Sequence, residues 1–120
     1  MSKALSILVV DDEADIVEFL ASEFEYQGYK VYSACCGCDA IELLKKHQVD
    51  VIVSDYKMPN GNGMTVLDFS RQIESPPRFY FISGMPELSV EECLEKGASK
   101  FFHKPSDIDE LITAVANLNK

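Results

Sequence analysis

The sequence predicts a single α/β domain in which a parallel β-sheet is sandwiched between helices. The chain has 120 residues, a length typical of one domain, and 47% of them are hydrophobic, which is enough for one continuous core. Apolar runs of strand length alternate five times with segments of helical periodicity. The runs are nearly uninterrupted, as expected for strands covered on both faces of a parallel sheet. We therefore expect one domain over residues 1–120, with no linker or internal repeat.

The first half of the chain is predicted to contain three strands and two helices. Strands are expected where apolar residues follow one another without a break, and helices where they recur three or four residues apart. Gly28 is typical of a helix end. The expected elements are a strand at 5–10, a helix with Ile16, Val17, Leu20 and Phe24 inward, a strand at 31–34, a helix at 40–46 with Ile41 and Leu44 inward, and a strand at 51–54.

A wide loop, residues 55–63, is expected to open the second half. Its run Asn60-Gly61-Asn62-Gly63 would indicate a hairpin only if strands flanked it. Apolar residues from Met64 to Ile73 instead recur at helical spacing, so we expect a helix that ends before Ser75-Pro76-Pro77. The remaining expected elements are a strand at 79–83, a short helix at 89–96 closed by Gly97, a strand at 100–103, and a helix with Ile108, Leu111, Ile112, Val115 and Leu118 inward, capped by Ser106 or Asp107.

The charge of the chain restricts its partners. Eleven basic residues against 20 acidic ones give a formal charge of -9, so the surface repels nucleic acid phosphates and anionic membranes. No apolar run approaches the roughly 20 residues that a membrane span needs. The apolar run near the amino terminus leads into acids without a signal-peptide cleavage site. We expect a cytoplasmic protein with reduced cysteines that binds neither nucleic acid nor membrane.

Residues 35–38 read Cys-Cys-Gly-Cys and raise the possibility of a metal or redox site. Structural zinc sites usually combine two separated cysteine pairs, or cysteines with histidines at turn spacing. Cys93 is isolated, and His47 and His103 do not have ligand spacing. The sequence favours small packing residues near a strand-to-helix turn over a metal site.

Polar side chains follow four of the predicted strands. Asp11 and Asp12 follow the first, Asp55 the third, Ser83 ends the fourth and Lys104 follows the fifth. In open, doubly wound sheets, ligands bind outside the carboxyl ends of the strands. Three converging carboxylates repel one another, and a hard divalent cation such as Mg²⁺ removes that cost. The sequence thus predicts a magnesium site at this edge of the sheet.

The same residues suggest phosphoryl transfer. Asp55 opens the widest loop, where a phosphoryl group has room to approach, and attack by its carboxylate would give an aspartyl phosphate. Positioning and charge neutralisation supply most of the catalysis in such reactions, and the Lys104 ammonium can contribute to both. Ser83 can donate a hydrogen bond to the phosphoryl group.

Each of these residues also has an ordinary structural interpretation. An isolated Asp can be a loop acid or a helix cap, because negative charge is favoured at helix amino termini. Ser83 can be a strand-end serine and Phe101 a core aromatic residue. Glu13 and Asp15 are expected to be first-turn charges of the first helix. The three acids together with Lys104-Pro105 favour the site.

Five segments, found in order at the predicted strand ends and turns, carry a resemblance to a known family. They are Val9–Glu13, Ser54–Pro59, Phe81–Gly84, Gly97–Ser99 and Lys104-Pro105. Over its whole length the chain resembles the response regulator receiver domain of bacterial two-component signalling. The resemblance implies a flavodoxin-like, doubly wound fold with five helices and a five-stranded parallel sheet in the order 2-1-3-4-5.

The resemblance also assigns the site. It implies that Asp55 is the phosphoacceptor and that Asp11, Asp12, Asp55 and the backbone carbonyl of Lys57 surround Mg²⁺. Lys104 would pair with the phosphoryl group. The protein would be a phosphoacceptor switch that supports only its own phosphorylation and self-dephosphorylation.

The family's switch residues correspond to Ser83 and Phe101. Ser83 would shift to bind the phosphoryl group and the ring of Phe101 would follow, although the tyrosine often found there is absent. The change would emerge on the surface of the fourth helix, fifth strand and fifth helix. The implied partners are a sensor histidine kinase or a histidine phosphotransfer protein as donor, and a downstream protein that the sequence does not identify.

Other functions fit the sequence less well. A haloacid dehalogenase-like phosphatase needs an acid two positions after its nucleophile and then a Thr or Val type residue, whereas Asp11-Asp12-Glu13-Ala14 offers Glu and Ala. A flavodoxin needs Ser, Thr and Gly amides around a flavin phosphate, and here that turn is acidic. A receiver that has lost phosphorylation is disfavoured by the complete acid set and Lys104.

Overall fold

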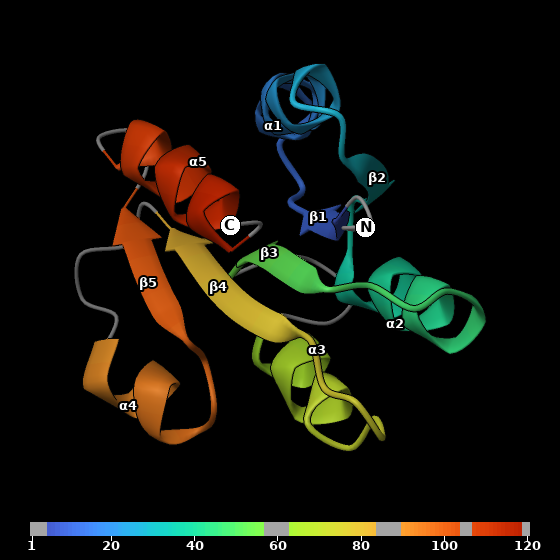
Figure 1. Ribbon diagram of the computed structural model, residues 1–120. Helices are drawn as coiled ribbons and strands as arrows, with labels where there is room; N and C mark the ends of the chain where they lie inside the picture. Colours follow the sequence, from blue (N-terminus) through green and yellow to red (C-terminus); the bar gives the residue numbers. More distant parts are fainter. Residues whose placement is uncertain (1–4, 57–62, 84–89, 104–106, 119–120) are drawn as a thin grey trace.

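The computed structural model describes residues 5–56, 63–83, 90–103 and 107–118, and in them strands and helices alternate as predicted (Figure 1). All strand pairs are parallel, and the predicted order β2-β1-β3-β4-β5 is confirmed. In chain order the elements are β1 (Ser6–Val10), α1 (Ala14–Tyr26), β2 (Lys30–Ala34), α2 (Gly37–Lys46), β3 (Val51–Asp55), α3 (Gly63–Ser70), β4 (Arg78–Ser83), α4 (Val90–Glu95), β5 (Lys100–His103) and α5 (Ile108–Asn117).

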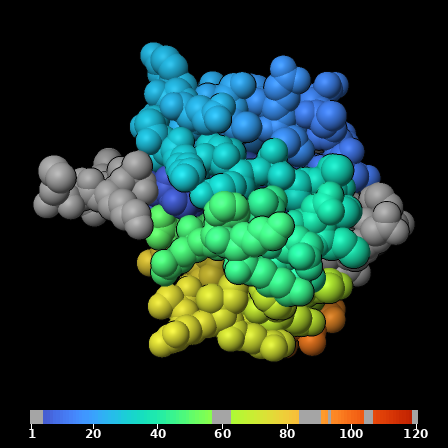
Figure 2. Space-filling model, turned by 90° about the vertical axis from the view of Figure 1, so that its right-hand side faces the viewer, coloured from blue at the N-terminus to red at the C-terminus, as the bar shows by residue number. Residues whose placement is uncertain are grey.

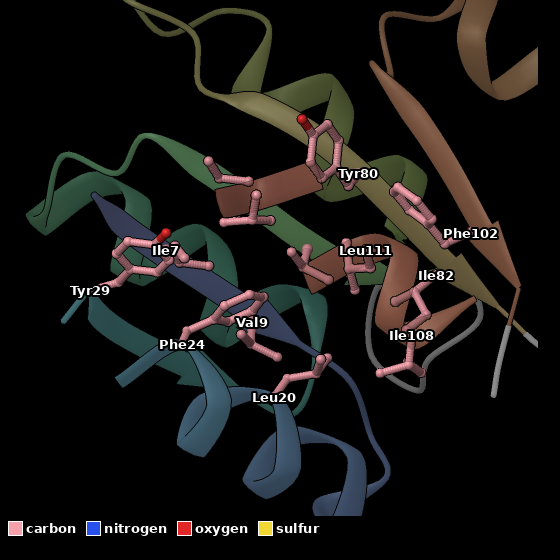
Figure 3. Close-up of a cluster of buried hydrophobic side chains, with 13 residues drawn as sticks. Ile7, Val9, Leu20, Phe24, Tyr29, Tyr80, Ile82, Phe102, Ile108 and Leu111 are labelled. Atoms are coloured by element: carbon pink, nitrogen blue, oxygen red, sulfur yellow. The ribbon is translucent and has the colours of Figure 1, made fainter. Parts of the chain in front are cut away.

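Helices cover both faces of the sheet, with α1 and α5 on one face and α2, α3 and α4 on the other (Figure 1). Each face has its own buried cluster. Ile7 and Val9 of β1 belong to the α1/α5 cluster drawn in Figure 3, while Leu8 and Val10 belong to the cluster on the opposite face. All four side chains are fully buried, which explains why this strand is apolar without interruption.

The strand register brings the predicted site residues to one edge of the sheet. Val10 of β1 lies opposite Ser54 of β3, so the residues that follow, Asp11 and Asp55, stand side by side. Asp55 in turn lies opposite Ile82 of β4, one residue before Ser83. The carboxyl ends of β1, β3 and β4 therefore meet where the acids and Ser83 are placed.

The predicted extent of the third helix was wrong at its carboxyl end, because α3 ends at Ser70 rather than near residue 73. The Leu67 carbonyl accepts two hydrogen bonds, from the buried Ser70 hydroxyl (2.7 Å) and from the Arg71 N–H (3.0 Å). The amides of Gln72 and Ile73 donate to carbonyls only three residues back. The chain thus leaves the helix through tight turns before Pro76 and Pro77.

The last two helices agree with the prediction to within a residue or two. Asp107 occupies the cap position of α5, but its carboxylate makes no bond to the first turn of the helix. Asp107 Oδ2 instead accepts a hydrogen bond from the backbone N–H of His103 (3.0 Å), which ties β5 to α5. Ser106, the alternative cap, lies outside the described residues. In the described part of the chain, no helix has both the length and the apolar character to cross a membrane.

The three neighbouring cysteines lie at the turn from β2 into α2. This is the side of the molecule that Figure 2 shows, where β2 and its flanking turns (cyan) lie between α1 (blue) and α2 (teal). Cys36 is the amino-terminal cap of α2, and its Sγ accepts a hydrogen bond from the Asp39 N–H (3.5 Å). Cys35 and Cys38 are exposed, and no disulfide joins the three. The cysteines thus lie at the strand-to-helix turn that the sequence predicted, where Cys36 is a helix cap rather than a packing residue.

Candidate functional site

Three carboxylates meet at the carboxyl edge of the sheet. Asp11 and Asp12 follow β1, Asp55 ends β3, and one oxygen from each lies within 4.8 Å of the others. Asp11 and Asp55 are buried and Asp12 is exposed. Among the described residues this is the one group of three acidic, histidine or cysteine side chains that could hold a metal ion.

Backbone amides orient the two buried carboxylates. The Glu13 N–H donates to Asp11 Oδ1 (2.9 Å), and the Tyr56 N–H donates to Asp55 Oδ1 (2.8 Å). The backbone N–H of Asp11 also donates to the Ala34 carbonyl of β2 (3.2 Å). The bonds from Glu13 and Tyr56 hold the two carboxylates at the strand ends.

Asp15 lies in the first turn of α1 as predicted, and Glu13 lies just before that turn, at the cap position. Negative charge there is stabilised by the positive end of the helix dipole. Neither residue belongs to the group of converging acids.

The donor set fits Mg²⁺. Hard divalent cations prefer carboxylate and carbonyl oxygens, and three ionised carboxylates so close together require a positive charge nearby. A hollow of about 390 Å³ adjoins Asp11 and Asp12, between α1 and the turn that contains Cys35. Lys57, whose carbonyl was expected to complete the set, lies outside the described residues.

Gly63 is a residue of the site that the sequence interpretation missed. It begins α3, and its N–H donates to the Tyr56 carbonyl (2.7 Å). A Cβ at this position would lie 2.3 Å from the Asp55 carbonyl oxygen and 2.7 Å from Cε1 of Phe81. Only glycine allows α3 to start this close to Asp55. The sequence hinted at this only through the Asn-Gly pairs, which were interpreted as part of a loop.

The predicted switch residues lie on neighbouring strands. Ser83 ends β4 and is fully buried, and it lies opposite His103 of β5. Phe101 is half-buried and packs against the cluster on the α2/α3/α4 face, with its ring centroid 6.2 Å from that of Phe81. Lys104, the predicted partner of the phosphoryl group, lies outside the described residues.

Comparison with known sequences identifies one family. Residues 7–116 match the family described as Response regulator receiver domain. The Response regulator SaeR of Staphylococcus aureus is 36% identical over 113 residues, which cover 93% of this chain and 49% of that protein. The chain thus spans about half the length of the curated relatives it matches.

Solved structures show the same similarity. The receiver domain of the Francisella response regulator 1452 matches with a TM-score of 0.86 and 31% identity, over 96% of both chains. A chain of the CheX-CheY-BeF3-Mg+2 complex from Borrelia burgdorferi matches with a TM-score of 0.85 and 30% identity, over 95% of this chain and 88% of that one. Both similarities extend over nearly the whole sheet and its helices.

Proposed function

The chain belongs to the family of response regulator receiver domains, and we propose that it is a phosphorylation-activated switch in which Asp55 accepts the phosphoryl group. A carboxylate oxygen of Asp55 would bond to phosphorus while the phosphorus–nitrogen bond of a phosphohistidine breaks and its electron pair returns to the imidazole. The observation that carries the proposal is that one oxygen of the Asp55 carboxylate lies within 4.8 Å of oxygens from two further carboxylates at the carboxyl edge of the sheet. The chain would be a phosphoacceptor rather than an enzyme with a separate substrate.

Mg²⁺ is the cofactor in this proposal. Asp11, Asp12, Asp55 and the backbone carbonyl of Lys57 are its proposed ligands. When bound, Mg²⁺ supplies the positive charge that offsets the carboxylates and the phosphoryl oxygens. The ammonium of Lys104 is proposed to pair with the phosphoryl group as a second positive charge.

Ser83 and Phe101 are the proposed switch pair. Ser83 would donate its hydroxyl proton in a hydrogen bond to the phosphoryl group, and Phe101 would change its packing in response. Phosphorylation then biases an equilibrium between two conformations of the surface formed by α4, β5 and α5. Phe101 is half-buried and packs against the cluster on the face that α4 covers (Figure 1), which supports this assignment.

The proposed donor is a sensor histidine kinase or a histidine phosphotransfer protein. The proposed receiver of the signal is a further protein that binds the α4, β5 and α5 surface. The charge of -9 argues against direct binding of nucleic acid by this chain. A cytoplasmic location is part of the same proposal, because such phosphorelays operate there.

The decisive experiment is to incubate the protein with acetyl phosphate and Mg²⁺ and to measure its mass. We expect the mass to rise by one phosphoryl group, and we expect Asp55→Asn to abolish the rise because an amide cannot act as the nucleophile. The absence of a gain in the native protein, or an equal gain in Asp55→Asn, would refute the proposal.

The metal assignment has its own test. Asp12→Asn removes one negative charge from the acid group, so the Mg²⁺ concentration needed for half-maximal phosphorylation should rise at least about tenfold. Asp68→Asn, on the exposed side of α3, removes the same charge elsewhere and should leave that concentration unchanged. Equal Mg²⁺ requirements for the two variants would exclude Asp12 as a ligand.

A further inference from the structure

A row of four aromatic rings leads from the acid group to the surface of β5. Ring centroids are 5.8 Å apart for Tyr56 and Phe81, 6.2 Å for Phe81 and Phe101, and 5.2 Å for Phe101 and His103. All three spacings lie in the range in which aromatic rings attract one another. The row begins at the residue directly after Asp55 and ends at an exposed imidazole.

The row is bonded to the phosphoacceptor at its first member. The Tyr56 N–H donates to Asp55 Oδ1, and the Tyr56 carbonyl accepts from the Gly63 N–H. Phosphorylation of the Asp55 carboxylate turns it into an acyl phosphate and moves its negative charge onto the phosphoryl oxygens. A neutral acyl oxygen is a weaker acceptor than a carboxylate oxygen, so the bond from Tyr56 weakens.

The ring of Phe81, the second in the row, cannot move without displacing its neighbours. Phe81 is fully buried, and its ring also contacts Phe79 at a centroid distance of 4.8 Å. Its Cε1 lies so close to Gly63 that even a methyl group there would collide with it. Because close-packed interiors shift between discrete arrangements rather than yielding gradually, a displacement near Asp55 must be passed on to the neighbouring rings.

We propose that Tyr56 and Phe81 are positioning residues that couple the state of the Asp55 carboxylate to Phe101 and His103 on β5. This inference rests on the proposed phosphorylation of Asp55. It adds a route that does not pass through Ser83, because Phe81 and Phe101 lie opposite each other two residues before Ser83 and His103. The face of β5 thus responds to Asp55 through packed rings as well as through the Ser83 hydroxyl.

The chain contains two histidines, so a response at the end of the row can be followed through their imidazole NMR signals. His103 ends the row, whereas the ring of His47 stacks on Tyr32 at 4.4 Å, beyond α2. We expect the imidazole NMR signals of His103 to shift when acetyl phosphate and Mg²⁺ are added, and those of His47 to stay in place. A wild-type protein that gains the phosphoryl mass without a shift at His103 would overturn the inference.

Two side-chain variants then interrupt the row, and both keep the acids and the backbone N–H of residue 56 that binds Asp55. Phe81→Leu keeps an apolar side chain, and Tyr56→Leu alters the half-buried first ring, so the second variant remains informative if the first does not fold. Each should gain the phosphoryl mass and show less than about half of the wild-type shift at His103. Tyr32→Leu is the matched control, which should move the His47 signals and preserve the full response of His103.

The outcomes separate the two proposals. No mass gain in the wild-type protein refutes phosphorylation itself. A mass gain with full His103 shifts in both Phe81→Leu and Tyr56→Leu leaves phosphorylation intact and refutes the row of rings, because the response would then reach β5 through Ser83 alone.

Discussion

The helix α4 contrasts with the two helices on the opposite face of the sheet. On one face, α1 and α5 have 13 and 10 residues and bury Leu20, Phe24, Leu111 and Val115 completely. On the other face, α4 has only six residues, and Leu94 is 43% exposed. The first face supplies a stable frame, whereas all the α4 side chains that the structure describes, Glu91, Glu92, Leu94 and Glu95, are exposed. The proposed switch surface includes α4.

The largest effect is expected in the core under α1. Phe24→Ala should lower the free energy of unfolding by about 3–5 kcal/mol, because it removes a fully buried ring and leaves a cavity. Phe19→Ala is the control on the same helix, where the side chain is 47% exposed, and should change stability by less than about 0.5 kcal/mol. Urea unfolding measures both. Similar losses would contradict the view of α1 as an anchored frame.

A smaller loss of stability, accompanied by slower phosphorylation, is expected where α3 meets the acid group. Gly63→Ala should cost about 1–3 kcal/mol, because the added methyl group collides with the Asp55 carbonyl and Phe81. It should also slow phosphorylation by acetyl phosphate. Gly28→Ala, where φ is +92° and a Cβ meets nothing within 4 Å, should cost about 1–2 kcal/mol through its backbone alone and leave phosphorylation unchanged. Equal phosphorylation rates for both variants would argue against the close contact at Gly63.

The comparison also shows which features a sequence can predict. The strands and the converging acids were predictable, since uninterrupted apolar runs indicate buried parallel strands and polar residues at their ends must meet at one edge. The end of α3 was not, because the backbone changes to hydrogen bonds between residues three apart at Gln72 and Ile73, although the helical spacing of apolar residues continues to Ile73. The role of Gly63 was also hidden. It depends on how closely two segments approach in space, and that distance cannot be predicted from the residue types along the chain.

The loss of stability at alkaline pH tests the burial of Tyr80, which belongs to the α1/α5 cluster. Burial raises the pKa of the Tyr80 phenol above its ordinary 10.0, and the positive charge of Arg78 lowers it in part. The unfolded chain therefore loses this proton at lower pH than the folded protein. Stability is unaffected below pH 10 and falls as the pH rises through the raised pKa. Urea midpoints at about pH 9 and about pH 11 should fall less for Tyr80→Phe than for the native protein, and an identical fall would contradict this.

The smallest effect is expected at α4. Leu94→Ala should change the free energy of unfolding by less than about 0.5 kcal/mol, because the residue is already 43% exposed and alanine favours the helix. Leu111→Ala on α5 is the matched substitution at a fully buried position and should cost about 2–5 kcal/mol. If α4 is the movable end of its face, amide hydrogen exchange in residues 90–95 should be fast in the native protein and unchanged by Leu94→Ala. A loss at Leu94 comparable to that at Leu111 would mean that α4 is anchored as firmly as α5, and the contrast between these two helices would not hold.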